Sequence, residues 1–210
     1  MSLYIKLLEG ERGLPSKQSL LPVLGTNIKC GNSLISRDVY NQLELFENNG
    51  DRIRPFDWEN DQDGFGSVMK TGGFDGVIGD PPYIQFSMVS YYDEVTNKYF
   101  IENYSSSMGR LNTFGLFIER AIRVALKKGG TMSYIVPNTL LTQNYYQELR
   151  QQMLKFDLVN ITTYEHPVFS GAVVETAVFV LKKSSTDKNK VSVAHCDNRL
   201  FTYQHRTIAQ

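Results

Sequence analysis

The chain has 210 residues, with 22 basic and 22 acidic side chains, and is long enough for one domain with a substantial core. Its 41% hydrophobic and 12% aromatic content favours a folded protein over a disordered one. The zero net charge gives no basic excess or stripe of the kind that a self-sufficient nucleic-acid-binding domain carries. No signal peptide or long apolar run is present, which disfavours a membrane role.

The first third of the sequence predicts short elements joined by loops. Apolar residues at helical spacing over 3–9 predict the end of a helix, and Asn27–Cys30 predicts a strand that stops at a turn. An amphipathic pattern over 36–52 predicts a second helix, before a loop-rich connection that extends to Gly73. Within that connection Gly64-Phe65-Gly66 lacks the third glycine of a phosphate-binding loop, so we interpret it as a flexible excursion.

Phe74–Gly79 predicts a short buried strand that ends abruptly. Val77 and Ile78 are β-branched, and the two prolines that follow Asp80 cannot extend a central ladder. Gly79 allows close approach to the backbone. The prolines hold Asp80 and Tyr83 at a defined separation, and the carboxyl ends of strands are where open α/β sheets bind ligands. A carboxylate and a ring presented in this way suit a flat ligand that bears an amino group.

The segment 84–111 is rich in tyrosine, serine and asparagine, which suits either a mobile loop over a substrate or an ordinary surface loop. Asn112-Thr113 then predicts the cap of a helix that ends at Lys127–Gly130. The apolar face of that helix consists of Phe114, Phe117, Ala121, Val124 and Ala125.

The last third predicts a strand over Thr131–Val136, a helix from about Thr142, and two more strands at Leu158–Tyr164 and Val173–Leu181. This order indicates an α/β fold with a mixed sheet whose final pair is antiparallel. From Lys182 the composition becomes polar, and 191–210 show one short strand pattern.

The cysteines and histidines suggest no metal site. Cys30 and Cys196 are far apart and have no ligand partners at a recognised spacing, so we expect free thiols and a reducing, cytoplasmic setting. His166, His195 and His205 show no spacing typical of a metal site or a nucleophile–base pair, so solvated or hydrogen-bonded side chains are expected.

Four segments in order carry a resemblance to a known family. Asp80-Pro81-Pro82-Tyr83 resembles motif IV of the amino-methyltransferases, [Asp/Asn/Ser]-Pro-Pro-[Tyr/Phe/Trp]. Asn27–Ile35 is similar to motif III, Gly129–Pro137 to motif VI, and Val168–Gly171 with the strand after it to motif VIII. Over about residues 20–183 this order resembles the γ-class N6-adenine DNA methyltransferases of the large type IIG restriction–modification enzymes. The implied fold is a partial S-adenosylmethionine-dependent methyltransferase (Rossmann-like) fold, with a mixed sheet, a C-terminal antiparallel hairpin and the first strands missing.

The resemblance implies roles for residues at the base. The Asp80 side chain and the Pro81 carbonyl would accept the two N–H groups of the adenine amine, with Pro82 fixing the turn. Tyr83 and Phe169 would stack on the two faces of the flipped base.

It also implies a cofactor site. Asn32 would contact the adenine of S-adenosylmethionine, and Phe114 and Phe117 would lie near its pocket. For both phenylalanines, core packing on an amphipathic helix is an equally good interpretation. No metal is implied.

The sequence departs from the family pattern in three respects. Asp80 stands where the large enzymes usually have asparagine, although the acceptor is kept. Motif I, with its glycine-rich loop, and the acidic residue for the cofactor ribose are both absent. We therefore expect residues 1–183 to be a partial catalytic domain and 184–210 an extension towards an absent target-recognition domain.

Such a fragment is expected to be inactive alone and to bind S-adenosylmethionine weakly or not at all. Double-stranded DNA would be the partner of the full-length protein, and the Asn27–Ile35 segment would be displaced or would pair with another copy of the chain. Two alternatives stay open. One is an amino-methyltransferase of RNA or protein, and the other is a non-catalytic nucleic-acid-binding or assembly module.

Overall fold

The computed structural model describes residues 24–40, 53–85, 94–107, 112–166, 168, 174–186, 189–196 and 203–210. The chain divides into two compact units, Met1–Cys30 and Gly31–Gln210. In the first unit the described residues form a short 3-10 helix, η1 (Leu24–Thr26), and Asn27–Cys30 is not a strand, so that prediction was wrong. The helix predicted over 3–9 lies outside the described residues.

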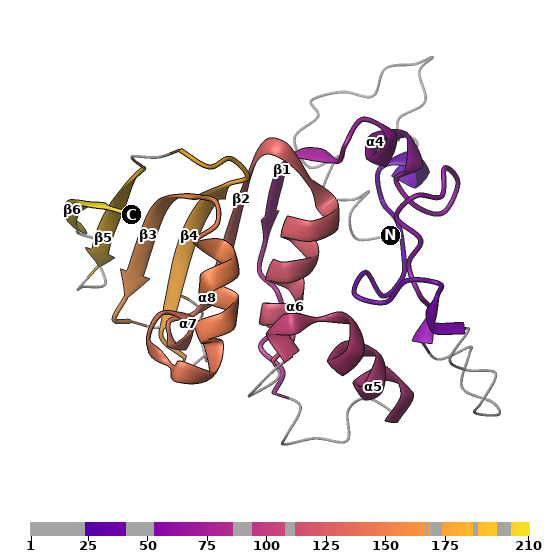
Figure 1. Cartoon of the computed structure of the whole chain (residues 1–210), viewed down its shortest axis with the longest axis horizontal. Helices are drawn as coiled ribbons and strands as arrows, with labels where there is room; N and C mark the ends of the chain where they lie inside the picture. Colours follow the sequence, from indigo (N-terminus) through magenta and orange to yellow (C-terminus); the bar gives the residue numbers. More distant parts are fainter. Residues whose placement is uncertain are drawn as a thin grey trace, which may run out of the picture. The chain divides into compact units, whose positions relative to one another are not determined.

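The second unit contains a six-stranded mixed sheet (Figure 1). Its strands lie in the order β1-β2-β4-β3-β5-β6. The pairs β1–β2 and β3–β5 are parallel and the other three are antiparallel. This confirms the mixed α/β sheet and the antiparallel pair formed by β3 and β4. The strand bounds are β1 (Phe74–Gly79), β2 (Leu126–Pro137), β3 (Asp157–Tyr164), β4 (Thr176–Lys182), β5 (Lys190–Cys196) and β6 (Tyr203–Ala209).

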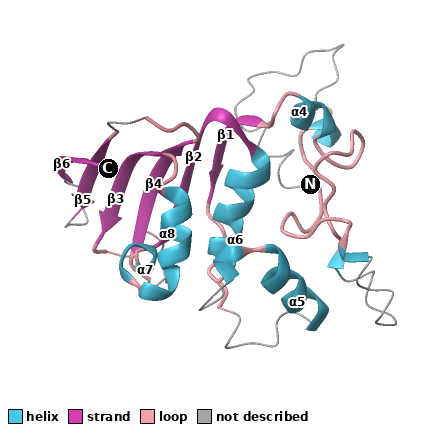
Figure 2. Cartoon of the chain, in the orientation of Figure 1, coloured by secondary structure: helices cyan, strands magenta, loops and turns pink. Residues whose placement is uncertain are grey.

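Helices α6, α7 and α8 lie over one face of this sheet (Figure 2). Asn112 caps α6 as predicted, because its side-chain oxygen accepts a hydrogen bond from the Phe114 amide at 3.3 Å. The helical bounds are α4 (Gly66–Lys70), α5 (Glu94–Asn103), η3 (Ser105–Ser107), α6 (Thr113–Arg120), η4 (Ala121–Ala125), α7 (Thr139–Thr142), η5 (Asn144–Tyr146) and α8 (Gln147–Met153). No helix among the described residues has the length and apolar character needed to cross a bilayer.

The end of the α6 segment differs from the prediction. The helix passes into a π-helical turn, η4, and β2 begins at Leu126 rather than at Thr131. Residues 127–130 lie between the pairs Phe74–Leu126 and Gly76–Thr131, where the register of β1 and β2 shifts, and Gly129 has a φ of +79°. Glycine adopts this left-handed conformation at little cost, so the Lys127–Gly130 segment belongs to the strand and not to a helix terminus.

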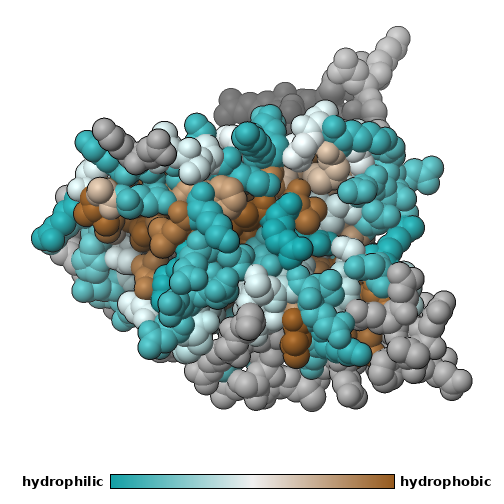
Figure 3. Space-filling model, in the orientation of Figure 1, coloured by the Kyte–Doolittle hydropathy of each residue, from teal (hydrophilic) through white to brown (hydrophobic). Residues whose placement is uncertain are grey.

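The main core lies between the sheet and helices α6 and α8. Every second residue of β2 points towards those helices and is buried, namely Met132, Tyr134 and Val136. Phe179 and Leu181 of β4 join them. Beside this core, an apolar groove of about 330 Å³ lies between α8 and the sheet, lined by residues that include Leu158 and Val193; apolar side chains form a band across the same face (Figure 3).

A second core forms around α5. Tyr99, Phe100 and Tyr104 are buried against Leu34 and Ile35 and other apolar residues near them. Both interpretations of 84–111 as a loop were therefore wrong for residues 94–107, because Tyr99 is a core residue of a helix and Tyr104, directly after that helix, is buried in the same core. Residues 86–93 and 108–111 lie outside the described residues.

The connection before β1 is also ordered by aromatic packing. Phe56, Trp58 and Phe65 contact one another, with ring centroids 5.1 to 6.2 Å apart, and Phe65 packs edge-on against Phe74. A Cβ at Gly64 would lie 1.8 Å from the Asp57 carbonyl oxygen, so only glycine fits this turn. The flexible excursion predicted here is therefore a tight, packed turn.

Strand β1 is not buried as the sequence predicted. Val77 packs against the main core, but Ile78 on the opposite face is 89% exposed. Among the described residues β1 pairs only with β2 and so lies at an edge of the sheet. The β-branched run predicted burial on both faces, but described elements cover only one.

The C-terminal residues form two strands where one was predicted, and both extend the sheet beyond β3. Gln210 fixes their end, because its side chain accepts from the Leu158 amide at 2.8 Å and donates to the Phe156 carbonyl at 2.6 Å. The sequence of β6 is mainly polar and its described side chains are exposed, so it lacks the apolar alternation that reveals a strand. The boundary at 183/184 stays a prediction.

Exposure at β1 makes a paired stability test possible. We expect Ile78→Ala to change the free energy of unfolding by less than about 0.5 kcal/mol, since the side chain is in solvent. Ile118→Ala, which removes a side chain of zero exposure in the main core, should cost about 2–5 kcal/mol. Urea denaturation of both variants measures the difference. Equal losses would contradict the edge position of β1.

Candidate functional site

Asp80-Pro81-Pro82-Tyr83 follows β1 directly, at the carboxyl end of a strand whose neighbour β2 runs parallel to it. Asp80 and Pro82 are exposed, Pro81 is buried and Tyr83 is half-buried. Exposed and buried residues therefore alternate along this turn. The Asp80 carboxylate faces solvent, while Pro81 and Tyr83 anchor the turn in the protein. Asp80 and Tyr83 therefore lie together at the sheet edge that the sequence predicted.

Tyr83 is held at both its ring and its hydroxyl. The hydroxyl donates a hydrogen bond to the Ile135 carbonyl at 3.1 Å, and the ring meets Phe114 edge-on, with centroids 6.3 Å apart and an interplanar angle of 87°. Burial raises the pKa of Tyr83 well above its usual range, and the negative charge of nearby Asp80 raises it further. Tyr83 is therefore a neutral ring in a fixed plane and not a proton acceptor.

Thr113, the first residue of α6, holds the backbone after the prolines. Its side chain is fully buried. The hydroxyl donates to the Pro82 carbonyl and accepts from the Ile84 amide at 2.9 Å, while the Thr113 amide donates to the Ile84 carbonyl at 3.0 Å. Among the described residues none donates a hydrogen bond to the Pro81 carbonyl. Sequence reasoning treated Thr113 only as part of a helix cap and missed this role.

Gly79 permits a close approach to the backbone, as the sequence predicted. A Cβ at this position would lie 3.0 Å from the ring of Tyr134, which is its register partner in β2. The close approach that glycine allows is therefore made by a neighbouring side chain of the sheet and not by a ligand.

Asn32 lies in a turn beside the later part of α6. Its side-chain oxygen accepts from the Leu34 amide at 3.2 Å, and the carbonyl of Ser33 accepts from the Arg120 guanidinium at 3.0 Å. Arg120 is seven residues after Thr113 along the helix, or about 10 Å. The structure therefore does not bring Asn32 together with Asp80, and Arg120, which the sequence did not single out, fixes its turn.

The two phenylalanines differ in exposure. Phe114 has no exposed surface and packs between Tyr83 and Tyr146. Phe117 is half-buried and packs against both cores. In the described part of the chain, these rings and Asn32 do not by themselves form a cradle for a cofactor, because the Asn32 oxygen is used in its own turn. Their assignment to S-adenosylmethionine stays a prediction.

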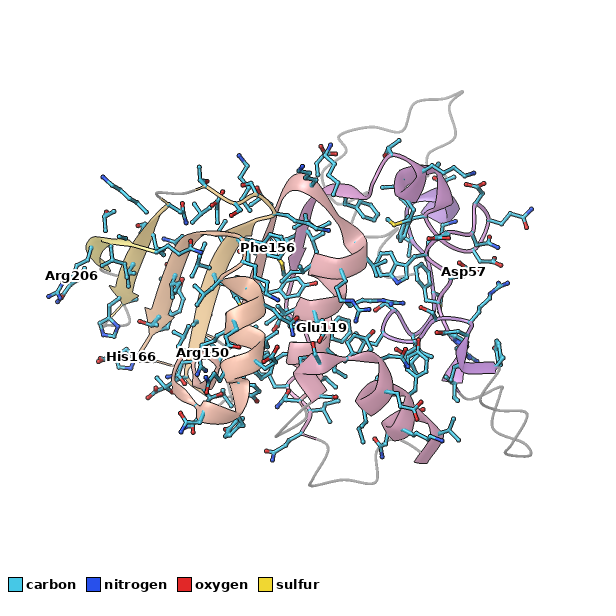
Figure 4. The ribbon with its side chains drawn as sticks, in the orientation of Figure 1. Asp57, Glu119, Arg150, Phe156, His166 and Arg206 are labelled. Atoms are coloured by element: carbon cyan, nitrogen blue, oxygen red, sulfur yellow. The ribbon has the colours of Figure 1, made fainter. Side chains whose placement is uncertain are left out.

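Phe169 lies outside the described residues, so its stacking role stays a prediction too. Among the residues that are described, no three histidine, cysteine or acidic side chains gather as a metal site would require. His166 is exposed just past the end of β3 (Figure 4). His195 lies between Thr163, at 2.8 Å, and Glu165, at 3.3 Å. The parallel pairing of β3 with β5 makes this contact, which sequence spacing could not reveal.

Two solved structures share this fold. The type IIL restriction–modification enzyme MmeI, solved in complex with DNA, matches with a TM-score of 0.51 and 13% identity over 81% of this chain and 24% of its own. DrdV, solved by cryo-electron microscopy as a complex with DNA, matches with a TM-score of 0.51 and 13% identity over 70% of this chain and 18% of its own. At this level of identity the two likenesses show that the sheet has the same fold.

A family model gives the particular assignment. The Eco57I restriction-modification methylase model matches residues 1–169, and the chain belongs to that family. The restriction enzyme and methyltransferase RM.Eco57I of Escherichia coli is 30% identical over 190 residues, which are 88% of this chain and 17% of that protein. The putative enzyme RM.MjaORFECS2P of Methanocaldococcus jannaschii is 30% identical over 158 residues, 75% of this chain and 12% of that protein. The chain thus spans less than a fifth of either relative.

Replacement of Thr113 tests the anchor of the loop. Thr113→Val should lower the free energy of unfolding by about 1–3 kcal/mol, because the Pro82 carbonyl and the Ile84 amide are then left without their partner. Thr113→Ser keeps the hydroxyl and should cost about 0.8 kcal/mol for the missing methyl group. Urea denaturation compares the two. A valine variant as stable as the serine variant would contradict the anchoring role.

Proposed function

We propose that this chain carries the target-base part of a site-specific DNA adenine-N6 methyltransferase of a restriction–modification system. One observation carries the proposal: an exposed carboxylate, Asp80, precedes Pro81 and lies near the fixed ring of Tyr83 at the carboxyl end of β1. Membership of a methylase family supports it. Double-stranded DNA is the proposed partner, by analogy with MmeI and DrdV.

The residues suit an exocyclic amine in a specific way. The adenine amino nitrogen is a poor nucleophile because its lone pair is delocalised into the ring. Two acceptors aimed at its two N–H groups stabilise a pyramidal nitrogen, and a hydrogen bond to a charged acceptor contributes about 1.5–3 kcal/mol. Asp80 is the charged acceptor and the Pro81 carbonyl is the neutral one. The backbone that carries both acceptors is held by Thr113 before the base arrives, which favours electrostatic stabilisation.

Access to the amine requires the base to leave the duplex, at a cost of roughly a few kcal/mol. Stacking on an aromatic ring returns about 1–3 kcal/mol per base. Tyr83 would supply one stacking face, and its hydrogen bond to Ile135 and contact with Phe114 limit the freedom that it loses on binding. Phe169 is the proposed second face. When bound, S-adenosylmethionine supplies the methyl group.

The reaction is tested with the natural gene product that carries this sequence. Labelled S-adenosylmethionine is supplied with mixed-sequence duplex DNA, with RNA or with protein, and nucleoside analysis identifies the product. We expect N6-methyladenine in DNA. Label in RNA or protein would favour the other amino-methyltransferases, and no transfer to any substrate would favour a non-catalytic binding module.

Substitutions at Asp80 then test the site. Asp80→Ala removes the charged acceptor and should lower the turnover number about 10²–10³-fold. Asp80→Asn keeps an oxygen acceptor and should retain much more activity. Because the Asp80 side chain is exposed, neither substitution should alter the midpoint of unfolding. An unchanged midpoint serves as the control that a loss of activity is not a loss of stability. Equal activity of the alanine variant and the parent would remove Asp80 from the mechanism.

Cofactor binding by the 210-residue chain is expected to be weak or absent, and the chain alone is expected to transfer no methyl group. The sequence has no identified glycine-rich motif I or ribose-binding carboxylate, and the Asn32 side-chain oxygen is bonded to the Leu34 amide. Isothermal titration calorimetry with S-adenosylmethionine checks the expectation. Tight one-to-one binding would show that other residues of this chain complete the cofactor site.

Self-association is expected at the edge of β1. An edge strand with an exposed apolar side chain is a template for pairing with another strand, and Ile78 meets that description. Sedimentation velocity across a concentration series should show a dimer, and Ile78→Lys should shift the equilibrium to monomer. A monomer at all concentrations for the parent chain would contradict this expectation.

A further inference from the structure

Four exposed lysines gather at the end of the sheet opposite to Asp80. They are Lys128, Lys155, Lys182 and Lys190, which we call the lysine surface. They belong to different segments, so the sequence, with its zero net charge, showed no basic stripe. Figure 4 labels residues before and after β3: Phe156 lies at the end with the lysine surface, and His166 lies at the opposite end.

The topology brings the first two lysines together. The Gly129 amide donates to the Lys183 carbonyl and the Lys183 amide donates to the Gly130 carbonyl, both at 2.8 Å. These bonds join the start of β2 to the end of β4. Lys128 directly precedes Gly129, and Lys182 directly precedes Lys183. The hydrogen bonds of Lys183 with Gly129 and Gly130 therefore make Lys128 and Lys182 neighbours across the two strands.

The other two lysines continue the row. Lys182 lies opposite Asp157, two residues after Lys155. The Asn189 side chain donates to the Leu158 carbonyl at 2.7 Å, which places the adjacent Lys190 at the same end of β3. Because neighbouring strands are about 4.8 Å apart, the three steps from β2 through β4 and β3 to β5 span about 15 Å.

The carboxylates near this row are already engaged. Asp75 pairs with Lys127, and Asp157 is buried and accepts from the hydroxyls of Ser184 and Thr186. Lys183 donates to the Leu126 carbonyl. In the described ranges no ion pair within 4.0 Å involves any of the four lysines of the lysine surface. The charge of Lys182 contributes to lowering the pKa of Asp157, and the other three ammonium groups remain available to an anion from outside.

We propose that the lysine surface binds the phosphate backbone of duplex DNA. A duplex presents one negative charge per about 1.7 Å of its axis, so a row about 15 Å long faces several phosphates. Lysines on flexible stems contact phosphates without reading bases, so they hold and orient a duplex without sequence preference. Since β1 spans about 17 Å from Phe74 to Gly79, this surface is separate from Asp80 and does not depend on the proposed methyl transfer.

The experiment measures the salt dependence of binding. A short fluorescein-labelled duplex of arbitrary sequence is titrated with the 210-residue chain at several KCl concentrations, and anisotropy gives the association constant. The variant K128Q/K155Q/K182Q/K190Q should bind more weakly, and its slope of log K against log salt should fall by about 0.9 for each phosphate that is no longer neutralised. All four sites are exposed, so the unfolding midpoint should not change.

Two controls keep the result specific. K70Q/K98Q removes two exposed lysines that are paired with Asp61 and Glu102 and should leave the slope close to that of the parent. The titration contains no S-adenosylmethionine and measures no methyl transfer, so a failure of the proposed methyl transfer would be distinguishable. The proposal is overturned if the quadruple variant keeps the parent slope. It is likewise overturned if polyglutamate binds the lysine surface more tightly than the duplex does, which would indicate an acidic protein as the partner.

Discussion

The hydrogen bonds of Thr113 hold together the two parts of the molecule on which the candidate site depends. They join the first turn of α6 to the backbone after Pro82, and α6 in turn packs on the sheet through Phe114 and Ile118. A turn that contains two prolines has no amide donors of its own at those positions, so its position must be fixed from outside. Because a buried hydroxyl makes these bonds, the carboxylate of Asp80 can be exposed without the loop being loose.

Local signals were enough to predict much of the fold. The Asn112 cap, the antiparallel β3–β4 pair and the strand that ends at two prolines each depend on a few adjacent residues. Burial of β1 was predicted wrongly because Val77 and Ile78 together indicate two covered faces, whereas only Val77 meets a described partner. The packing of Tyr99 and Phe100 against Leu34 involves residues more than 60 positions apart, which no pattern within 84–111 contains.

The candidate site was predictable in part for the same reason. Asp80 and Tyr83 are local to one turn, and the structure places them as the motif indicates. Arg120 and Thr113 act through contacts with distant segments, and the lysine surface arises from the order of strands in the sheet. Sequence alone cannot supply that order. The resemblance identified the family, while the neighbours of each residue come only from the fold.

The Pro81 carbonyl leads to one more conclusion. In the proposed site one of the two acceptors for the amine is a main-chain atom, so no exchange of a side chain can delete it directly. Divergence at this position is then confined to the partner acceptor. This accounts for a motif that varies among aspartate, asparagine and serine at its first letter while both prolines stay. Evolution could retune the charge next to the nitrogen, and hence the amine that is accepted, without rebuilding the turn.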